Sequence, residues 1–524
     1  MILINASPRD ALRIFQPFLP IYVPVGIGYL VAMAEREGIE AHIVDEQIED
    51  DALGRIAGLV RGMRPPHLFG FSVLTAALKS AVDLAGRLKE RYPDSVICFG
   101  GIHPTAAPDE VLSFPQVDAV IRGEGEYPLL ELARCVREGR DHRHISGLSY
   151  RDGGRTVHNG CAPLIEDLDA LPPFPYHRFT SPRYDLGFVI SSRGCPYGCI
   201  FCSNRVTTGR RYRIRSAESI VREIELLAGS YGRRQVLFLD DNLLVSRERI
   251  HRLLEAIRAR GLHRSMTFSF QARGDNVDRP LLQELYDSGF RSVFFGLETA
   301  SERIMKAIQK GETVAQCAEA VTLAKSIGFH VSATFIYALP GETHEDRMDC
   351  VRLGRALRLD MVRFNNATPY PGTRLYEMAR DEGRLHVQGL YENFVSVSTF
   401  VENPFRKIPF SYVPAGNTEN EIRRDILFSY FSYYLDFARL KAIFARPDLG
   451  VGWFNAGHRL GELLRKLPAL FVLGMMLFFK FGQLFHYAVL KRETAISLRF
   501  FLRVFDGLWR RGAAAGAGGA EGAR

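Results

Sequence analysis

The sequence predicts an α/β protein with two parallel sheets in succession, followed by a mainly helical and hydrophobic C-terminal region. Three observations lead to this prediction. The chain has 524 residues, which is more than one ordinary domain holds. Apolar residues make up 47% of it and charged residues 24%, as in globular proteins. A strand–helix rhythm runs through residues 1–140 and begins again over residues 185–375.

The first 140 residues alternate short apolar runs with helical patterns. This alternation predicts a parallel sheet with helices on both faces, the flavodoxin-like (Rossmann-type) class. Ligands of such sheets bind at the carboxyl ends of the strands. The candidate strands are residues 2–5, 41–45, 68–72, 96–99 and 119–122, and the candidate helices are residues 26–37, 51–62, 76–92 and 127–138.

Glycines, hydroxyl-bearing residues, a histidine and a glutamate gather at these predicted strand ends. Glycine lets the backbone approach a large ligand closely, and the hydroxyls can hydrogen-bond its edge. The alternative is that the glycines only make turns between strands and helices. The candidate ligand-contacting residues are Ser72, Thr75, Gly100, Gly101, His103, Thr105, Gly123 and Glu124.

Residues 141–184 are predicted to connect two domains. The stretch 148–157 has the pattern of a hairpin with a Gly-Gly turn, and the run 171–176 is rich in proline and therefore extended.

Three of the eight cysteines, Cys195, Cys199 and Cys202, form a C-x3-C-x2-C motif. A structural zinc site usually needs four ligands, often as two C-x2-C pairs, and the sequence has no second pair. A disulfide framework needs an oxidising compartment, and the other cysteines are scattered singly. The motif therefore indicates an iron–sulfur cluster with one iron left open.

After this motif, six strand–helix units predict a partial (β/α)6 barrel, with its chemistry at the carboxyl ends of the strands. The predicted strands are residues 187–191, 235–239, 267–272, 292–296, 331–336 and 361–365. Polar residues follow most of them. Individually these residues could be helix caps, but together they suggest a second ligand site.

The cysteine motif, with an aromatic residue (Phe201) before its last cysteine, resembles that of the radical S-adenosylmethionine (SAM) superfamily. The N-terminal Pro24-x-Gly26, Gly-Gly-x-His-x-Thr and Gly-Glu-Gly-Glu stretches resemble the cobalamin-binding domain that precedes many radical SAM domains. The resemblance covers roughly residues 1–375 and implies a [4Fe–4S] cluster, SAM and cobalamin as cofactors. One departure is that the D-x-H-x-x-G motif, which supplies a histidine to cobalt elsewhere, is absent. His103 is therefore expected to contact cobalamin without being its axial ligand.

The resemblance also implies roles for residues at the barrel strand ends. Asp240, Asp241 and Asn242 would approach the amino group of SAM. Gln271, Arg273 and Glu298 would lie near its ribose and carboxylate. Phe201 would contact SAM beside the cluster, and Tyr337 and Gly341 would flank the adenine. No catalytic residue beyond these cofactor contacts is identified.

Residues 376–511 are predicted to be helical and hydrophobic, and residues 512–524 to be a disordered Ala/Gly tail. The uncharged run 467–479 is shorter than the roughly 20 apolar residues that span a bilayer. Residues 498–509 combine apolar helical spacing with arginines, which favours a helix in a membrane interface. A buried helical subdomain is the alternative.

These features predict a cobalamin-dependent radical SAM enzyme that methylates an unactivated carbon of an apolar or lipid-like small molecule. An external donor such as a ferredoxin or flavodoxin would reduce the cluster. An oxidative cyclase, of the anaerobic magnesium-protoporphyrin ester cyclase type, and a non-catalytic cobalamin-binding regulator are alternatives. The net charge of +8 without a basic–aromatic block argues against nucleic acid as a partner. Without a signal-peptide pattern, a cytoplasmic location is expected, with peripheral contact to the inner face of the membrane.

Overall fold

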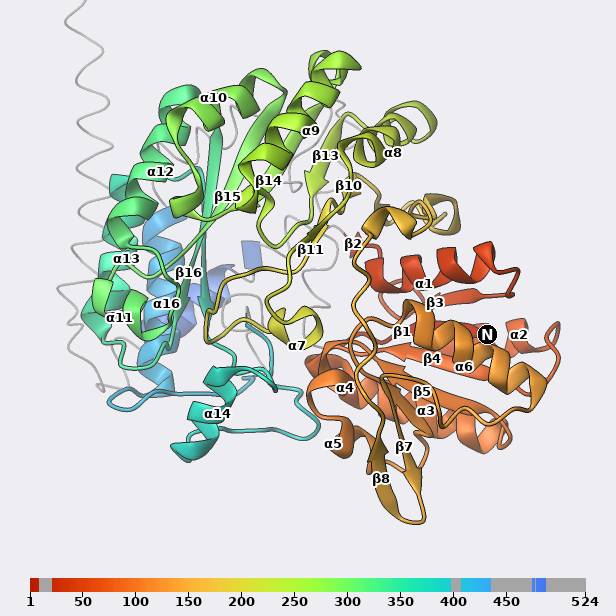
Figure 1. The fold of residues 1–524 in the computed structure, drawn as a ribbon. Helices are drawn as coiled ribbons and strands as arrows, with labels where there is room; N and C mark the ends of the chain where they lie inside the picture. The colour runs from red at the N-terminus through yellow and green to blue at the C-terminus, as the bar shows by residue number, and fades with distance from the viewer. Residues whose placement is uncertain (9–20, 397–406, 435–473, 476, 487–524) are drawn as a thin grey trace, which may run out of the picture.

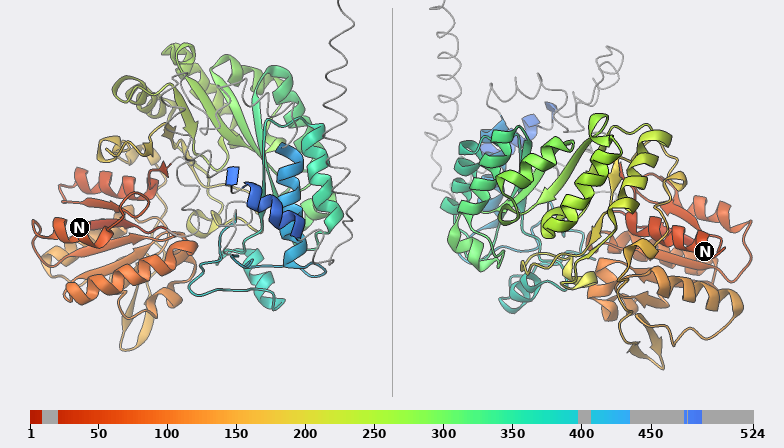
Figure 2. Two further views of the ribbon diagram at one scale, coloured as in Figure 1. Left: turned by 180° about the vertical axis from the view of Figure 1, so that it is seen from behind. Right: turned by 45° about the horizontal axis from the view of Figure 1, so that its top comes forward.

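The chain folds into two sheet-based halves that lie side by side, the N-terminal half at the lower right of Figure 1 and the barrel at its upper left. The computed structural model describes residues 1–8, 21–396, 407–434, 474–475 and 477–486. Both views in Figure 2 show the same side-by-side arrangement.

The N-terminal half is a seven-stranded sheet in the order β3-β1-β4-β5-β6-β7-β8. Its first five strands are parallel and follow the flavodoxin-like order, so the predicted fold class is confirmed. The strands are β1 (Ile2–Asn5), β3 (His42–Asp45), β4 (Leu68–Ser72), β5 (Val96–Gly100), β6 (Ala119–Ile121), β7 (Leu148–Asp152) and β8 (Arg155–His158). The helices are α1 (Val25–Arg36), α2 (Ala52–Val60), α3 (Leu78–Arg91), α4 (Ile102–Ala106), α5 (Pro108–Leu112) and α6 (Glu126–Glu138).

The predicted hairpin exists, but it does not stand apart as a connector. Strand β7 pairs antiparallel with β6 and so extends the N-terminal sheet. Gly153 and Gly154 make the turn with φ of +54° and +82°, the left-handed values that a two-residue hairpin turn requires.

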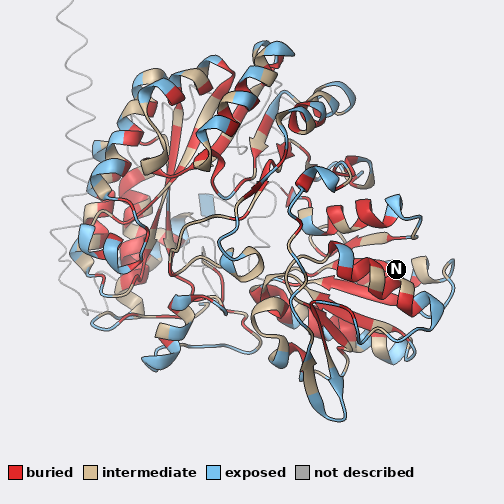
Figure 3. Cartoon of the chain, viewed as in Figure 1, coloured by how far each residue is buried: buried red, intermediate tan, exposed pale blue. Residues whose placement is uncertain are grey.

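Buried residues on both faces explain why the parallel strands form. Ile2, Leu3 and Ile4 of β1 are all buried, and Figure 3 shows these strands in red between helices with exposed outer faces. Leu3 belongs to an apolar cluster that continues into the barrel, whereas Ile2 and Ile4 face a separate cluster. The proline-rich connector joins the two halves: the Phe174 ring lies 5.4 Å from Tyr29 of α1 and 5.3 Å from Phe188 of the barrel.

The central half is a six-stranded sheet in the order β10-β13-β14-β15-β16-β17, in which every neighbouring pair is parallel. This confirms the partial (β/α)6 barrel. The strands are β10 (Phe188–Val189), β13 (Gln235–Phe238), β14 (Thr267–Ala272), β15 (Phe290–Glu298), β16 (His330–Tyr337) and β17 (Met361–Asn366). The helices are α7 (Arg205–Thr208), α8 (Ala217–Ser230), α9 (Arg247–Ala259), α10 (Arg279–Asp287), α11 (Glu302–Ala307), α12 (Val314–Ile327), α13 (His344–Ala356) and α14 (Arg374–Asp381).

Two small sheets complete the strands. A two-stranded hairpin, β11 (Ser192–Arg193) and β12 (Arg213–Ile214), brackets the cysteine motif. Strands β2 (Ile21–Tyr22) and β9 (Tyr184–Asp185) pair in parallel and link the N-terminal half to the connector.

Helix α16 (Glu419–Tyr434) packs against α13 and the last barrel strand. The Tyr434 hydroxyl accepts a hydrogen bond from Val362 N at 2.8 Å, and the Tyr430 hydroxyl accepts one from Phe364 N at 3.1 Å. These phenols satisfy backbone groups of β17, the edge strand of the sheet, which would otherwise be open for pairing.

Part of the C-terminal prediction lies outside the described residues. This concerns residues 435–473, 476 and 487–524, which include the predicted interfacial helix, the Ala/Gly tail and most of the uncharged run. Within the part of the chain that is described, none of the helices has both the length and the hydropathy that a bilayer crossing requires.

Candidate functional site

A cavity of about 330 Å³ lies between the carboxyl ends of the N-terminal strands and the hairpin that brackets the cysteine motif. Its N-terminal wall comes from the turns after β4, β5 and β6, and its barrel wall includes Arg193, Gly194 and Asp241. Of the predicted cobalamin contacts, five line it: Ser72, Gly100, Gly101, Gly123 and Glu124. In Figure 1, α7 lies between the two halves beside this region, where it packs on α4.

Glycines form part of the N-terminal wall of the cavity. Gly101 has a φ of +102°, and a Cβ there would lie 3.1 Å from both Val73 N and Val73 O. Gly123 has a φ of +82°, and a Cβ at Gly26 would meet nothing within 4 Å. The glycines leave room for a large ligand, and apolar side chains beside them, such as Leu30 and Ile121, suit the apolar surface of a corrin, so the residues present suit cobalamin.

Three predicted cobalamin contacts do not line the cavity. Thr105 supports its wall from behind: its Oγ1 donates to Gly101 O at 2.7 Å and accepts from Gly123 N at 3.0 Å. Thr75 is buried after β4. His103 is fully buried in α4, and neither ring nitrogen has a hydrogen-bond partner among the residues that the structure describes. Its ring packs on Tyr391 at 4.9 Å, and burial lowers the pKa of His103 to about 4.

Local backbone geometry fixes the loop that carries the three cysteines. Gly194 has a φ of +86°, and a Cβ there would lie 2.0 Å from Arg211 O across the hairpin, so only glycine fits. Further along, Ile200 N donates to Ile308 O at 3.1 Å, and Leu375 N donates to Ile200 O at 2.9 Å. The loop is thus tied to two distant parts of the barrel.

The three thiols are free and half-buried. Burial raises the pKa of all three, that of Cys202 to about 12, while the nearby Lys310 and Arg273 act in the opposite direction on Cys195 and Cys199. Metal binding supplies the free energy that deprotonates such thiols. Three thiols of one loop that act on one another electrostatically fit a [4Fe–4S] cluster and leave one of its irons without a protein ligand.

The aspartates after β13 differ in their surroundings. Asp240 is fully buried and accepts hydrogen bonds from the hydroxyls of Ser191 (2.8 Å) and Ser192, so it braces the start of the cysteine loop. Asp241 faces the cavity and accepts from Asn204 Nδ2 at 2.6 Å. Asp241 is solvent-exposed, but the protein around it partly desolvates its carboxylate, and this desolvation and the neighbouring Asp240 raise the pKa of Asp241.

Two further predicted SAM contacts are already engaged. Asn242 Nδ2 donates to Asn276 Oδ1 at 2.7 Å. Arg273 makes two 2.9 Å hydrogen bonds to Asp275, and its guanidinium lies 3.6 Å from the centre of the Tyr197 ring inside the cysteine loop. Arg273 therefore supports the loop from the barrel side.

Glu298 ends β15 with a φ of +60°, a strained value for a residue other than glycine. It forms a 3.0 Å ion pair with Lys310, which is buried and forms a second 3.0 Å pair with Glu312. Lys310 lies two residues after Ile308, whose carbonyl accepts the hydrogen bond from Ile200 N of the cysteine loop, so it lies close to the cluster site. Sequence analysis missed Lys310. Its signal was a Lys-Gly-Glu turn after the helix that follows Glu298.

The remaining candidates occupy several positions on the barrel. Phe201 and Gln271 are half-buried, Phe201 in the cysteine loop and Gln271 near the end of β14. Gly341 has a φ of +74°, and its carbonyl accepts from Arg303. Tyr337 is fully buried, and its hydroxyl contacts Arg347 O at 2.9 Å and Ser429 Oγ at 2.7 Å. The Tyr337 side chain therefore packs under α16. That Tyr337 flanks the adenine of SAM stays a prediction.

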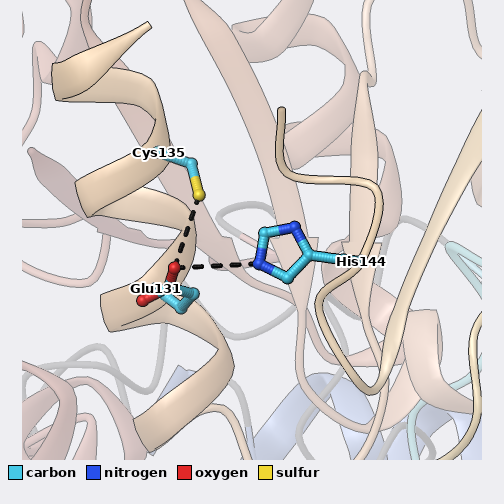
Figure 4. Close-up of side chains that lie close together, drawn as sticks. All are labelled: Glu131, Cys135 and His144. Atoms are coloured by element: carbon cyan, nitrogen blue, oxygen red, sulfur yellow. Dashed lines mark hydrogen bonds and ion pairs between the residues drawn. The ribbon is translucent and has the colours of Figure 1, made fainter. Parts of the chain in front are cut away.

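Another group of metal-ligand side chains lies on α6 and the loop after it. Figure 4 shows Glu131 between Cys135 and His144, with Oε1 3.6 Å from Cys135 Sγ and 3.8 Å from His144 Nε2. Arg140 approaches the same oxygen at 3.5 Å, and Arg134 lies 3.7 Å from the other oxygen. A cation would have to compete with two guanidinium groups, and none of these residues lines the cavity.

Comparison with known proteins identifies the two halves. The model of the radical SAM superfamily matches residues 189–354, and that of the B12 binding domain matches residues 16–133. An uncharacterized methyltransferase of Pyrococcus horikoshii is 34% identical over 362 residues, which cover 68% of this chain and 78% of that protein. The chain belongs to the cobalamin-dependent radical SAM methyltransferase family. Its cofactors are accordingly a [4Fe–4S] cluster, SAM and cobalamin.

Two other relatives carry more specific names. The anaerobic magnesium-protoporphyrin IX monomethyl ester cyclase of Cereibacter sphaeroides is 27% identical over 459 residues, covering 85% of this chain and 72% of the cyclase. The hopanoid C-3 methylase of Methylococcus capsulatus is 24% identical over 363 residues, covering 67% of each.

Solved structures share the fold of this family member. The cobalamin-dependent SAM radical enzyme OxsB, solved with aqua-cobalamin and SAM bound, has a TM-score of 0.66 at 16% identity, covering 97% of this chain and 83% of OxsB. The radical SAM methyltransferase TsrM of Kitasatospora setae has a TM-score of 0.61 at 21% identity, covering 72% of this chain and 74% of TsrM.

Proposed function

We propose that this family member methylates an unactivated carbon of an apolar, lipid-like small molecule. The observation that carries the proposal is the single cavity whose walls come from the glycine turns of the B12-binding half and from Arg193, Gly194 and Asp241 of the barrel. When bound, the reduced cluster supplies the electron that cleaves SAM, and cobalamin supplies the methyl group. The protein's task is to hold both cofactors toward one substrate position.

We assign the residues around the cluster to SAM by their charge. Lys310, Glu298 and Glu312 form a buried group with one positive and two negative charges, which suits the amino group of SAM, and Lys310 holds the two carboxylates in place. Asp241 faces the cavity and also suits the SAM amino group. Residues 1–140 would then bind cobalamin, residues 185–375 the cluster and SAM, and residues 376–511 the substrate.

Three observations support an apolar substrate and contact with a membrane surface. The hopanoid C-3 methylase is, by its name, a relative that acts on a lipid. Among the described residues of the stretch 474–486, four apolar side chains are exposed, namely Met475, Phe478, Phe479 and Phe485. A net charge of +8 would favour an anionic lipid surface.

The test begins with anaerobic purification, cluster reconstitution and analysis for iron, sulfide and cobalt. The reconstituted protein is then given SAM, reduced flavodoxin or ferredoxin, and a lipid extract. We expect about four irons and one cobalamin per chain, and a product that is larger than its substrate by one carbon. Protein that keeps iron but takes up no cobalamin would overturn the proposal.

A cyclase is the second candidate, because the protoporphyrin ester cyclase matches the largest share of this chain among the three relatives compared. Product mass separates the two reactions, since cyclisation adds no carbon. A product from magnesium-protoporphyrin monomethyl ester with an unchanged carbon count would favour the cyclase.

A further inference from the structure

Four charged side chains form a buried network where the two halves meet. Arg193 Nη1 lies 3.0 Å from Glu124 Oε1, and Arg193 Nη2 lies 2.6 Å from Glu126 Oε1. Arg213 makes two hydrogen bonds to Glu124, at 2.7 Å and 2.9 Å. Both arginines belong to the β11–β12 hairpin, whereas Glu124 lies in the turn between β6 and α6 and Glu126 is the first residue of α6.

Both carboxylate oxygens of Glu124 accept two hydrogen bonds each. Its Oε1 accepts from both arginines, and its Oε2 accepts from Arg213 and from Ile165 N at 2.8 Å. The exposed fraction of the four side chains is 16% for Arg193, 8% for Glu124, 7% for Glu126 and 3% for Arg213. These low exposed fractions show that the protein shields the network from water. Its two positive and two negative charges balance, so the network is neutral overall.

Its position links the two cofactor sites. Arg193 is two residues before Cys195, and the intervening Gly194 allows no freedom, because a Cβ there would meet Arg211 O at 2.0 Å. Glu124 follows Gly123 in a turn that lines the cavity. The same arginine also lies 5.0 Å from the centre of the Tyr29 ring in α1, a second contact with the B12-binding half.

We propose that Glu124 is a positioning residue: through Arg193 and Arg213 it fixes the cysteine loop over the cavity, so that the protein sets the spacing of the cluster and cobalamin before either is bound. This differs from the expectation that Glu124 contacts cobalamin directly. The consequence for methyl transfer rests on the proposed function, whereas the positioning of the loop does not.

The first test uses the apo-protein and Glu124→Gln. The amide keeps the shape of the side chain but cannot balance two guanidinium groups. The matched control is Glu166→Gln, because Glu166 forms a 2.7 Å ion pair with Arg211 of the same hairpin but is 61% exposed. We measure hydrogen–deuterium exchange of the segment 191–214. Glu124→Gln should speed its exchange by about tenfold or more, and Glu166→Gln should leave it unchanged.

The second test uses the reconstituted holoenzyme and compares two products of SAM. Reductive cleavage to 5′-deoxyadenosine needs only the cluster and SAM. Methyl transfer to cobalamin, measured as S-adenosylhomocysteine, also needs the two cofactor sites in register. Since a displacement of 1 Å can cost about 100-fold in rate, Glu124→Gln should lose S-adenosylhomocysteine formation by about that factor while it keeps most of its 5′-deoxyadenosine formation.

Equal exchange in Glu124→Gln and Glu166→Gln would overturn the inference. If Glu124→Gln does not fold, Arg193→Lys takes its place, because lysine keeps the charge but cannot bridge Glu124 and Glu126 with one planar group. If the wild-type enzyme forms no S-adenosylhomocysteine, the proposed function fails, and the exchange experiment still decides the positioning role.

Discussion

At the scale of single residues, the cluster depends on three thiols that no neighbouring side chain can replace. Cys199→Ala removes one of three cluster ligands, so we expect iron content to fall and reductive SAM cleavage to drop below detection. The control is Cys161→Ala, which removes an exposed free thiol outside the motif. Iron analysis and 5′-deoxyadenosine quantification check this result. Cleavage at the wild-type rate in Cys199→Ala would contradict the cluster assignment.

Gly194 is the residue that fixes how the cysteine loop leaves the hairpin. Gly194→Ala would place a Cβ 2.0 Å from Arg211 O at a φ of +86°, whereas Gly209→Ala has a φ of +60° but meets nothing within 4 Å. Both variants carry positive-φ backbone strain of about 1–3 kcal/mol. Only Gly194→Ala adds the steric conflict, roughly 1–3 kcal/mol more. Denaturant unfolding should show a larger loss in the free energy of unfolding for Gly194→Ala than for Gly209→Ala. Equal losses would show that the hairpin can shift to accommodate the added Cβ.

The residues that sequence analysis could and could not identify differ in what fixes their role. The three cluster ligands of a C-x3-C-x2-C motif can be identified from the sequence, because they lie within one short loop. Lys310 and the Glu124 network depend on contacts between distant segments, and local sequence holds no record of them. Tyr337 stands at the predicted strand end, but the packing of α16 decided where its side chain points.

At the scale of elements, α16 is held to the barrel by a buried ionic contact. Asp425 is fully buried and lies 2.7 Å from Arg347 Nε of α13 and 2.9 Å from His344 Nδ1. We expect Asp425→Asn to cost about 3–5 kcal/mol in the free energy of unfolding. The buried Arg424 would lose its 2.7 Å carboxylate partner, and Arg347 would keep its 3.3 Å pair with Glu342 alone. Asp349→Asn breaks the exposed pair with Arg352 on the same helix and should cost about 0.5 kcal/mol or less.

The same contact has a pH dependence with a definite sign. Burial alone would raise the pKa of Asp425, but its hydrogen bond with His344 and the charges of Arg347 and Arg424 outweigh burial and leave the pKa below its usual 3.8. A depressed folded-state pKa gives stability that is present above the unfolded value and is lost as the pH falls through the folded one. Unfolding measured below pH 3.8 should therefore show a smaller acid-induced loss in Asp425→Asn than in the wild type. An equal loss would contradict this assignment.

The elements themselves were largely predictable, since every predicted strand overlaps an observed one. Parallel strands buried on both faces leave continuous apolar runs, which are a local signal. Helix α4 was missed because its five residues follow Gly101 within a glycine-rich turn, where composition indicates a loop. The attachment of β7 to the N-terminal sheet was also missed. A hairpin pattern in the sequence predicts that two strands pair with each other, but it does not show which other strand they join.

At the scale of the whole molecule, the two halves share one apolar cluster and one cavity. A ligand in that cavity touches both, so its binding free energy should stabilise both at once. At a concentration of aquacobalamin one hundred times its dissociation constant, we expect the free energy of unfolding to rise by about 2.7 kcal/mol. Calorimetry should show the N-terminal and barrel transitions moving together, and movement of the N-terminal transition alone would contradict a shared site.

A pair of glycine variants ties this stabilisation to the cavity. Gly101→Ala places a Cβ 3.1 Å from the Val73 backbone at a φ of +102° and so displaces the cavity wall. Gly139→Ala is also left-handed, with a φ of +64°, but it ends α6 with nothing within 4 Å and does not line the cavity. Each variant is compared with its own apo form. Gly139→Ala should keep the aquacobalamin shift and Gly101→Ala should lose most of it, because only the latter alters the surface against which a corrin would lie. An undiminished shift in Gly101→Ala would place cobalamin elsewhere in the molecule.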